Sequence, residues 1–171
     1  MEKAPEGIAP TIGNTYADWK NILKSGKDVD KAFRGRKNLI GLITRLLTPL
    51  RMWETFRLKD KLQQTAINPE PVFILGHWRS GTTFLLNLMS RDPQFGFLTN
   101  IHGLFPHSFM CNGIIPFVME HVMPRTRPMD NMRLALKSPQ EEELALMNMG
   151  PYSLYHMWTF PKQIMDVYER T

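Results

Sequence analysis

The fold is decided by the stretch Pro71-Val72-Phe73-Ile74-Leu75-Gly76-His77-Trp78-Arg79-Ser80-Gly81-Thr82-Thr83-Phe84-Leu85-Leu86. Its first part, Val72 to Leu75, is an apolar run behind a Pro-Glu-Pro breaker, which predicts a strand covered on both faces. Gly76 and Gly81 then bracket a turn, and the pattern from Thr82 onward predicts a helix that ends before Asp92-Pro93. We therefore expect a strand, a glycine-bounded loop and a helix N-terminus in succession.

This succession is typical of an anion-binding loop. The first N–H groups of a helix have no partner inside the helix, and glycines let the backbone approach an oxyanion closely. The spacing from Gly76 to Gly81 is that of the triphosphate-binding P-loop, but Thr82 stands where that motif has its lysine. Arg79 supplies a cation inside the loop instead. The loop therefore favours one phosphate with a neighbouring transferable group over a triphosphate.

These residues carry a family resemblance. Arg79-Ser80-Gly81-Thr82-Thr83, followed by an apolar residue, resembles the 5′-phosphosulfate-binding loop of sulfotransferases that use 3′-phosphoadenosine 5′-phosphosulfate (PAPS), in the branch with arginine in place of the lysine of the cytosolic enzymes. A second stretch, from Arg127-Pro128-Met129-Asp130-Asn131-Met132 through Ser138-Pro139-Gln140-Glu141-Glu142-Glu143, resembles the same branch. The likeness runs from about Lys37 to near the end of the chain. It implies PAPS as the sulfuryl donor, a hydroxyl or amine acceptor, and no metal.

The resemblance also implies which residues hold the donor. Arg79 is expected to neutralise the sulfuryl group and the leaving phosphate, as both a catalytic and a cofactor-binding residue. Ser80, Gly81, Thr82 and Thr83 are expected to bind the 5′-phosphosulfate. Phe84 occupies the position of an adenine-stacking tryptophan, although packing in the core explains an aromatic residue there equally well.

The general base has several candidates. The resemblance places the acid-rich segment at the acceptor site, and within it we favour Glu142. Glu141 and Glu143 are alternatives, and Glu141 also completes a Ser-x-x-Glu capping box for a helix predicted from Ser138 to Met149. His102 and His107 are the remaining candidates, which ordinary loop positions also explain.

The expected fold is α/β, a P-loop-type parallel sheet with flanking helices and an N-terminal helical segment. We divide it into residues 1–35, an arm and a short helix, and residues 36–171, the N-terminal part of a sulfotransferase domain. Members of this family have a second half that supplies an arginine and a serine for the 3′-phosphate of PAPS, and the chain has no counterpart to it. We therefore expect the N-terminal portion of a longer protein.

Helical spacing extends well outside the central stretch. It predicts helices over 16–24, 37–47, 48–64, 82–91 and 114–123, with Thr48-Pro49 separating the second from the third. We also expect a short second strand over 94–99 and a last helix after Pro161. We interpret the apolar stripes of the second and third helices as core, namely Leu39, Ile43, Leu46, Leu47, Leu50, Trp53, Phe56 and Leu62.

Composition fits a soluble globular protein, with 171 residues, 43% hydrophobic and 22% charged. The single cysteine, Cys111, excludes an internal disulfide and an all-cysteine metal site, and it favours a reducing, cytoplasmic location. Residues 1–10 lack the apolar core of a signal peptide, and the apolar run over 38–50 is shorter than the ~20 residues that span a bilayer.

The net charge of +5 is concentrated between Asp18 and Lys61, with twelve Lys or Arg against five Asp or Glu. Two interpretations remain open: a solvated helical face, or a surface that attracts acidic lipid headgroups or an anionic substrate. Nucleic-acid binding is not expected, because the basic run matches no nucleic-acid-reading module.

Two other functions compete with sulfotransfer. One is a P-loop nucleotide kinase or NTPase that uses Mg²⁺, against which Thr82 argues because it replaces the lysine. The other is a non-catalytic fragment or binding module that keeps the helical surface.

Overall fold

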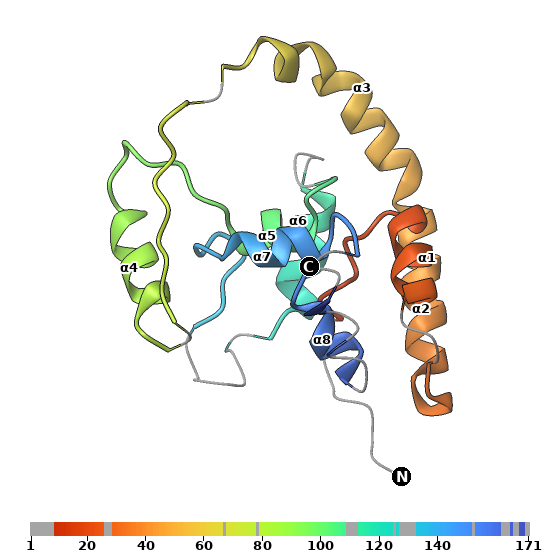
Figure 1. Cartoon of the computed structure of the whole chain (residues 1–171). Coiled ribbons are helices and arrows are strands. Elements are labelled where there is room, and N and C mark those ends of the chain that lie inside the picture. Colours follow the sequence, from red (N-terminus) through yellow and green to blue (C-terminus); the bar gives the residue numbers. More distant parts are fainter. Residues whose placement is uncertain are drawn as a thin grey trace.

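The computed structural model in Figure 1 describes residues 9–25, 29–66, 68–77, 79–108, 113–124, 126, 133–151, 153–161, 165 and 168–169. In chain order its helices are α1 (Tyr16–Ser25), the 3₁₀ turn η1 (Lys31–Phe33), α2 (Arg34–Leu46), α3 (Thr48–Gln64), α4 (Thr82–Met89), α5 (Asn100–Leu104), α6 (Ile114–Val122), α7 (Glu142–Met147) and α8 (His156–Thr159). The predicted helices in the first two thirds of the chain are confirmed, including the break before Thr48-Pro49. Most of the segment after Pro161 lies outside the described residues.

The predicted parallel sheet is wrong. Across the described residues the structure has no strand, and its β pairing is limited to isolated bridges between Thr99 and Pro139 and between Thr126 and Arg133. Residues 71–77 carry no assigned secondary structure, and the side chains of Phe73 and Leu75 are 74% and 90% exposed. A central parallel strand needs a strand on each edge and helices on both faces. Among the described residues this run has no neighbouring strand, so its apolar composition did not lead to burial.

The body of the molecule forms around α5, α6 and α7 (Figure 1). One core cluster combines Ile101 and Phe105 of the α5 region with Ile115 and Met119 of α6 and Leu136. The backbone of 98–101 pairs with that of 136–140, where Asn100 N–H donates to Ser138 O (3.0 Å) and Gln140 N–H donates to Leu98 O (2.9 Å). The predicted strand over 94–99 is thus reduced to one bridge at Thr99. The pairing nevertheless fixes where the acidic segment begins.

A buried amide ties three distant segments together. Asn148, 0% exposed, has the carbonyl oxygens of Pro10, Gly103 and Leu144 within 2.8–3.1 Å of its Nδ2, and its Oδ1 accepts from Gly13 N–H at 3.0 Å. Gly103 permits the close approach of α5 and α7, because a Cβ there would lie 3.0 Å from Cδ2 of Leu144. The N-terminal segment, α5 and α7 therefore form one hydrogen-bonded unit.

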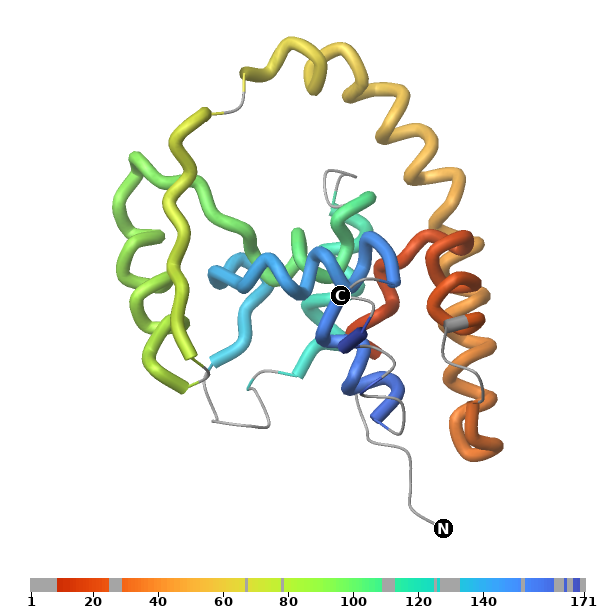
Figure 2. The backbone as a smooth tube through the Cα atoms, viewed as in Figure 1, coloured from red at the N-terminus to blue at the C-terminus, as the bar shows by residue number. Residues whose placement is uncertain are grey.

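Helices α1 and α2 lie on the other side of the body from α4, and α3 extends from them across the top of the view towards the side of α4 (Figure 2). Trp19 and Ile22 of α1 pack against Ile40 of α2 in a second core cluster. Leu47 N–H donates to Ile43 O (2.9 Å) and Arg51 N–H donates to Leu47 O (3.0 Å), so the helical hydrogen bonds continue from α2 into α3. Figure 2 shows the chain leaving the body along α3 and returning through 71–77 beside α4.

The core interpretation of the stripes on α2 and α3 is wrong for most of their residues. Leu46, Phe56 and Leu62 are 69%, 84% and 66% exposed, and Leu39 and Trp53 are exposed as well. Leu47 and Leu50 do pack against the first core cluster. The buried positions of α3 are instead Arg51 and Glu54, and Arg51 Nη2 donates to Gly13 O at 2.9 Å. Spacing identified the helices correctly but not the face that is covered.

Candidate active site

The glycine-bounded loop is set by its own backbone. Arg79 and Gly81 both have positive φ angles, 61° and 95°, and Arg79 is the one non-glycine residue of the described chain in that region. Ser80 N–H and Ser80 Oγ both donate to His77 O, at 3.1 and 2.6 Å. A Cβ on Gly76 would lie 2.6 Å from Cγ2 of Thr82 and 2.8 Å from Oγ of Ser80. The loop is therefore curled tightly onto the start of α4.

Helix α4 begins directly after this loop. Gly81 is its N-cap and its carbonyl accepts the first helical bond, from Leu85 N–H at 3.0 Å. No side chain caps the helix, so the N–H groups of Thr82, Thr83 and Phe84 have no acceptor within it. Around Gly81 an added Cβ would meet nothing within 4 Å. Phosphate groups bind at helix N-termini of this kind.

A cleft of about 430 Å³ lies between α4 and the start of α7. It is lined by Val72, Ile74, Thr82, Leu86, Gly96, Phe97, Leu98, Gln140, Glu141 and Glu142. Two residues predicted to act in the site, Thr82 from the loop and Glu142 from the acidic segment, thus line one cleft although they lie sixty positions apart in the chain. Its walls are otherwise mostly apolar.

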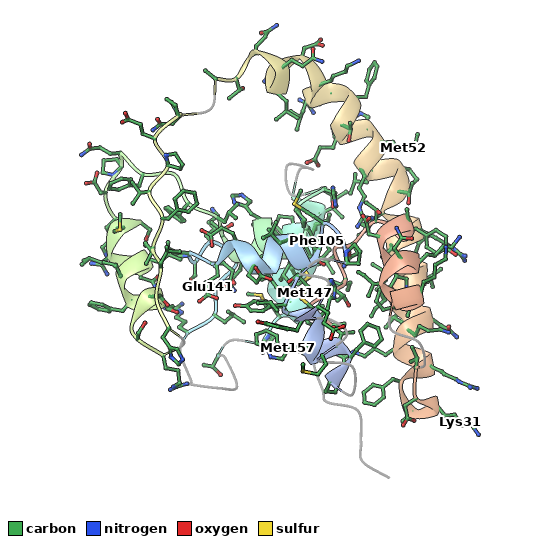
Figure 3. The ribbon with its side chains drawn as sticks, in the orientation of Figure 1. Lys31, Met52, Phe105, Glu141, Met147 and Met157 are labelled. Carbon is green, nitrogen blue, oxygen red and sulfur yellow. The ribbon has the colours of Figure 1, made fainter. Side chains whose placement is uncertain are left out.

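The acidic segment is organised differently from the prediction. Helix α7 begins at Glu142 with Glu141 as its N-cap, so the predicted start at Ser138 and the capping box are wrong. The Glu141 carboxylate, labelled in Figure 3, accepts from Tyr155 Oη at 2.5 Å. The Glu143 carboxylate accepts from Ser153 Oγ (2.6 Å) and Leu154 N–H (3.0 Å). Both carboxylates hold the segment that leads into α8.

Unlike Glu141 and Glu143, Glu142 accepts no hydrogen bond from the segment that leads into α8. Its side chain is exposed, lines the cleft, and makes no hydrogen bond or ion pair with any described residue. A free carboxylate at the wall of a cleft can accept a proton from a bound group.

The two histidine candidates lie elsewhere. His102 Nδ1 accepts from Thr99 N–H (3.3 Å) at the start of α5, and burial lowers the pKa of its imidazole. Burial also lowers the pKa of His107, and the nearby positive charge of Arg51 adds to this effect. Neither residue lines the cleft.

Arg79 and Phe84 are exposed beside the cleft rather than in its wall. The guanidinium of Arg79 makes no hydrogen bond or ion pair with the residues that the structure describes. Phe84 is 73% exposed, so core packing does not explain it. The apolar walls, Ile74, Leu86, Phe97 and Leu98 among them, were not recognised as part of a site. The one available signal was that Ile74 and Leu86 flank the loop motif, whereas Phe97 and Leu98 lie far from both motifs in the sequence.

No group of three or more His, Cys, Asp or Glu side chains that could hold a metal ion occurs among the described residues. Nor is any helix in the described part of the chain both long and apolar enough to cross a bilayer.

Comparison with known sequences identifies the family. The sequence model of the sulfotransferase family matches residues 71–167, more than half of the chain. The chain belongs to the sulfotransferase family. This confirms the family predicted from the Arg79–Thr83 motif. Part of the second motif, residues 127–132, lies outside the described residues.

Two curated sulfotransferases resemble the chain. The omega-hydroxy-beta-dihydromenaquinone-9 sulfotransferases of Mycobacterium bovis and Mycobacterium tuberculosis are each 34% identical to it over 114 residues. The matched region covers 67% of this chain and 29% of each relative, so the chain spans less than a third of these relatives. No solved structure matches the chain.

Proposed function

We propose that the protein takes part in transfer of a sulfuryl group from PAPS to a hydroxyl group, at the cleft between α4 and α7. The observation that carries this proposal is that Thr82 of the motif loop and the free carboxylate of Glu142 line the same cleft. Family membership and the threonine at position 82 argue against the kinase alternative. Because the chain spans less than a third of its curated relatives, a non-catalytic role remains the alternative to test.

The loop residues fit a sulfated phosphate by their chemistry. PAPS, when bound, supplies the sulfuryl group. The unpaired N–H groups of Thr82, Thr83 and Phe84 and the cation of Arg79 form a set of donors suited to an anion. The hydroxyls of Thr82 and Thr83 donate to no described group, whereas that of Ser80 is engaged with His77 O. Ser80 therefore acts chiefly by shaping the loop, because its N–H is also engaged with His77 O.

Glu142 acts as the general base in this proposal. An acceptor hydroxyl must lose its proton as it attacks, and a carboxylate that no described group occupies can take that proton. Glu141 and Glu143 are less suited because each already accepts hydrogen bonds from the 153–155 segment. Stabilisation of the charge that develops on the leaving phosphate falls to Arg79 and the start of α4.

The acceptor is proposed to be a hydroxyl compound with an apolar body. Val72, Ile74, Leu86, Phe97 and Leu98 provide an apolar wall next to Glu142. A lining of this kind stabilises hydrocarbon by removing it from water. The curated relatives are named for an omega-hydroxy compound, which agrees with a hydroxyl acceptor.

The test is calorimetric titration of the chain with adenosine 3′,5′-bisphosphate, and separately with ATP and Mg²⁺. We expect metal-independent binding of the bisphosphate that weakens by about tenfold in Arg79→Ala, because a charge-assisted contact to phosphate is lost. Arg91→Ala is the matched control, since Arg91 is equally exposed and follows α4 at its other end. It should bind as the unmodified chain does.

Turnover is then measured as transfer of labelled sulfuryl from PAPS to dodecanol. Transfer that disappears in Glu142→Gln while bisphosphate binding persists supports Glu142 as the general base and the loop before α4 as the donor site. Preference for ATP with Mg²⁺ contradicts the proposal, and so does bisphosphate binding that is unchanged in Arg79→Ala. A folded chain that binds the bisphosphate but never turns over shows that this part of the enzyme only binds the donor.

A further inference from the structure

An exposed apolar seam runs along α2 and α3. Its members recur at alternating steps of three and four residues, as Leu39, Leu42, Leu46, Pro49, Trp53 and Phe56. This spacing places side chains on one face of a helix. All six are exposed, and Phe56 is 84% exposed. Met52 lies beside the seam and is turned away from α5 and α7 in Figure 3. The seam is continuous because helical hydrogen bonds bridge Leu47.

The opposite face of the same two helices is the one that the body covers. Ile40, Thr44, Arg51 and Glu54 are buried, and they too are separated by helical steps. Two of these four are ionisable, whereas the exposed seam contains no charge at all. The helices therefore turn their apolar side to solvent, which is costly for a surface without a partner.

Cations border the seam. From Arg34 to Gln64 the chain has eight Lys or Arg and two Asp or Glu, whereas the rest of the chain has thirteen and fourteen. The positive net charge of the protein therefore resides on these two helices. Arg45, Arg57 and Lys59 are exposed next to seam residues, and the guanidinium of Arg57 lies 5.1 Å from the centre of the Trp53 ring. An apolar face with aromatic residues and a cationic border is typical of a helix that lies in a membrane interface.

We propose that α2 and α3 dock the protein on a bilayer with anionic headgroups. In this arrangement the seam lies among the acyl chains close to the headgroups, while Arg57 and Lys59 meet the phosphates. A second copy of the chain fits this surface poorly, because it would oppose two regions of the same positive charge, in which Asp60 is the one exposed acidic residue of α2 and α3.

The experiment is co-sedimentation of the 171-residue chain with vesicles, followed by the fluorescence of its tryptophans. Vesicles of equal parts phosphatidylglycerol and phosphatidylcholine are compared with vesicles of phosphatidylcholine alone. We expect binding to the anionic vesicles, a blue shift from Trp53, and loss of binding at high salt. Arg57→Gln and Lys59→Gln should each weaken binding by about fivefold.

Leu46→Gln and Leu62→Gln form the matched pair. Both leucines lie on these helices and are 69% and 66% exposed, but Leu62 lies outside the seam. Leu46→Gln should lower the partition coefficient by about tenfold, and Leu62→Gln by less than about twofold. Unchanged far-ultraviolet circular dichroism verifies that both variants fold.

Three results overturn the proposal: no binding to anionic vesicles, equal binding to neutral ones, or equal loss in both leucine variants. A dimer in sedimentation analysis that Leu46→Gln converts to a monomer would instead assign the seam to contact between copies.

Discussion

Thr82 and Glu142 face the same cleft, but the segments that carry them are held in different ways. Glu142 begins a helix whose far end, at Asn148, is hydrogen-bonded to the N-terminal segment and to α5. Thr82 follows a loop whose shape depends on two positive φ angles and on bonds to His77 O, with exposed side chains around it. The position of Glu142 thus depends on long-range packing, whereas that of Thr82 depends on local backbone geometry.

The strongest test of the packed side is Asn148→Ala. It leaves Gly13 N–H and several buried carbonyl groups without a partner, so we expect the free energy of unfolding to fall by about 3 kcal/mol. Urea unfolding measures this change. The control is Asn38→Ala at an exposed position of α2, which should change the free energy of unfolding by less than about 0.5 kcal/mol. A loss below about 1 kcal/mol would mean that the amide does not hold the body together.

The cleft itself is tested by Glu142→Gln. If this carboxylate accepts the proton of the acceptor, kcat should fall about 100-fold while stability stays unchanged, since the side chain contacts no described group. Steady-state kinetics with PAPS and dodecanol measure the effect. Glu120→Gln, an exposed position of α6, should leave kcat unaltered. Equal effects of both substitutions would remove Glu142 from the reaction.

The local geometry of the loop is tested by a pair of glycines that both have open space. An added Cβ meets nothing within 4 Å at Gly81 or at Gly35, but Gly81 has φ 95° and Gly35 lies in α2. Gly81→Ala should therefore lower stability by about 1 kcal/mol through backbone strain, and Gly35→Ala should raise it by about 0.5 kcal/mol. Thermal unfolding of both variants measures this, and the same sign in both would show that the loop does not depend on its left-handed residue.

The smallest expected effect is a pH dependence of the free energy of unfolding, which comes from His156. Burial lowers the pKa of His156, whose Nε2–H donates to Gly150 O at 2.8 Å, so the unfolded chain binds its proton more readily. Stability from this residue is present above the ordinary histidine pKa of about 6.5 and is lost as pH falls below it. His156→Gln should reduce the fall in the free energy of unfolding between about pH 7.5 and pH 5.5, measured with urea, and His121→Gln, exposed on α6, should not. Greater stability at the lower pH would contradict the assignment.

The local parts of this molecule could be predicted from sequence. The loop, the start of α4 and the break at Thr48-Pro49 follow from glycine, proline and helical spacing, which act over a few residues. The motif from Arg79 to Thr83 also led to the family. What could not be predicted depends on distant partners.

Two errors have the same physical origin. The run from Val72 to Leu75 and the stripe predicted on α2 and α3 are apolar enough for a core. Val72, Phe73, Leu75 and five of the eight stripe residues are nevertheless exposed, because burial requires a partner surface that spacing alone does not reveal. The start of α7 was misplaced for a related reason: Ser138 and Pro139 pair with the 98–101 segment instead of capping a helix.

The bond between Gly13 and Asn148 joins positions 135 residues apart. A ribosome that makes this chain must therefore pass Asn148 before the N-terminal segment can form this bond. Before that point α1 and α2 can pack against each other, but the apolar residues that contact α5 and α7 in the folded protein stay exposed. During synthesis the protein is consequently prone to aggregate until the N-terminal segment packs against α5 and α7.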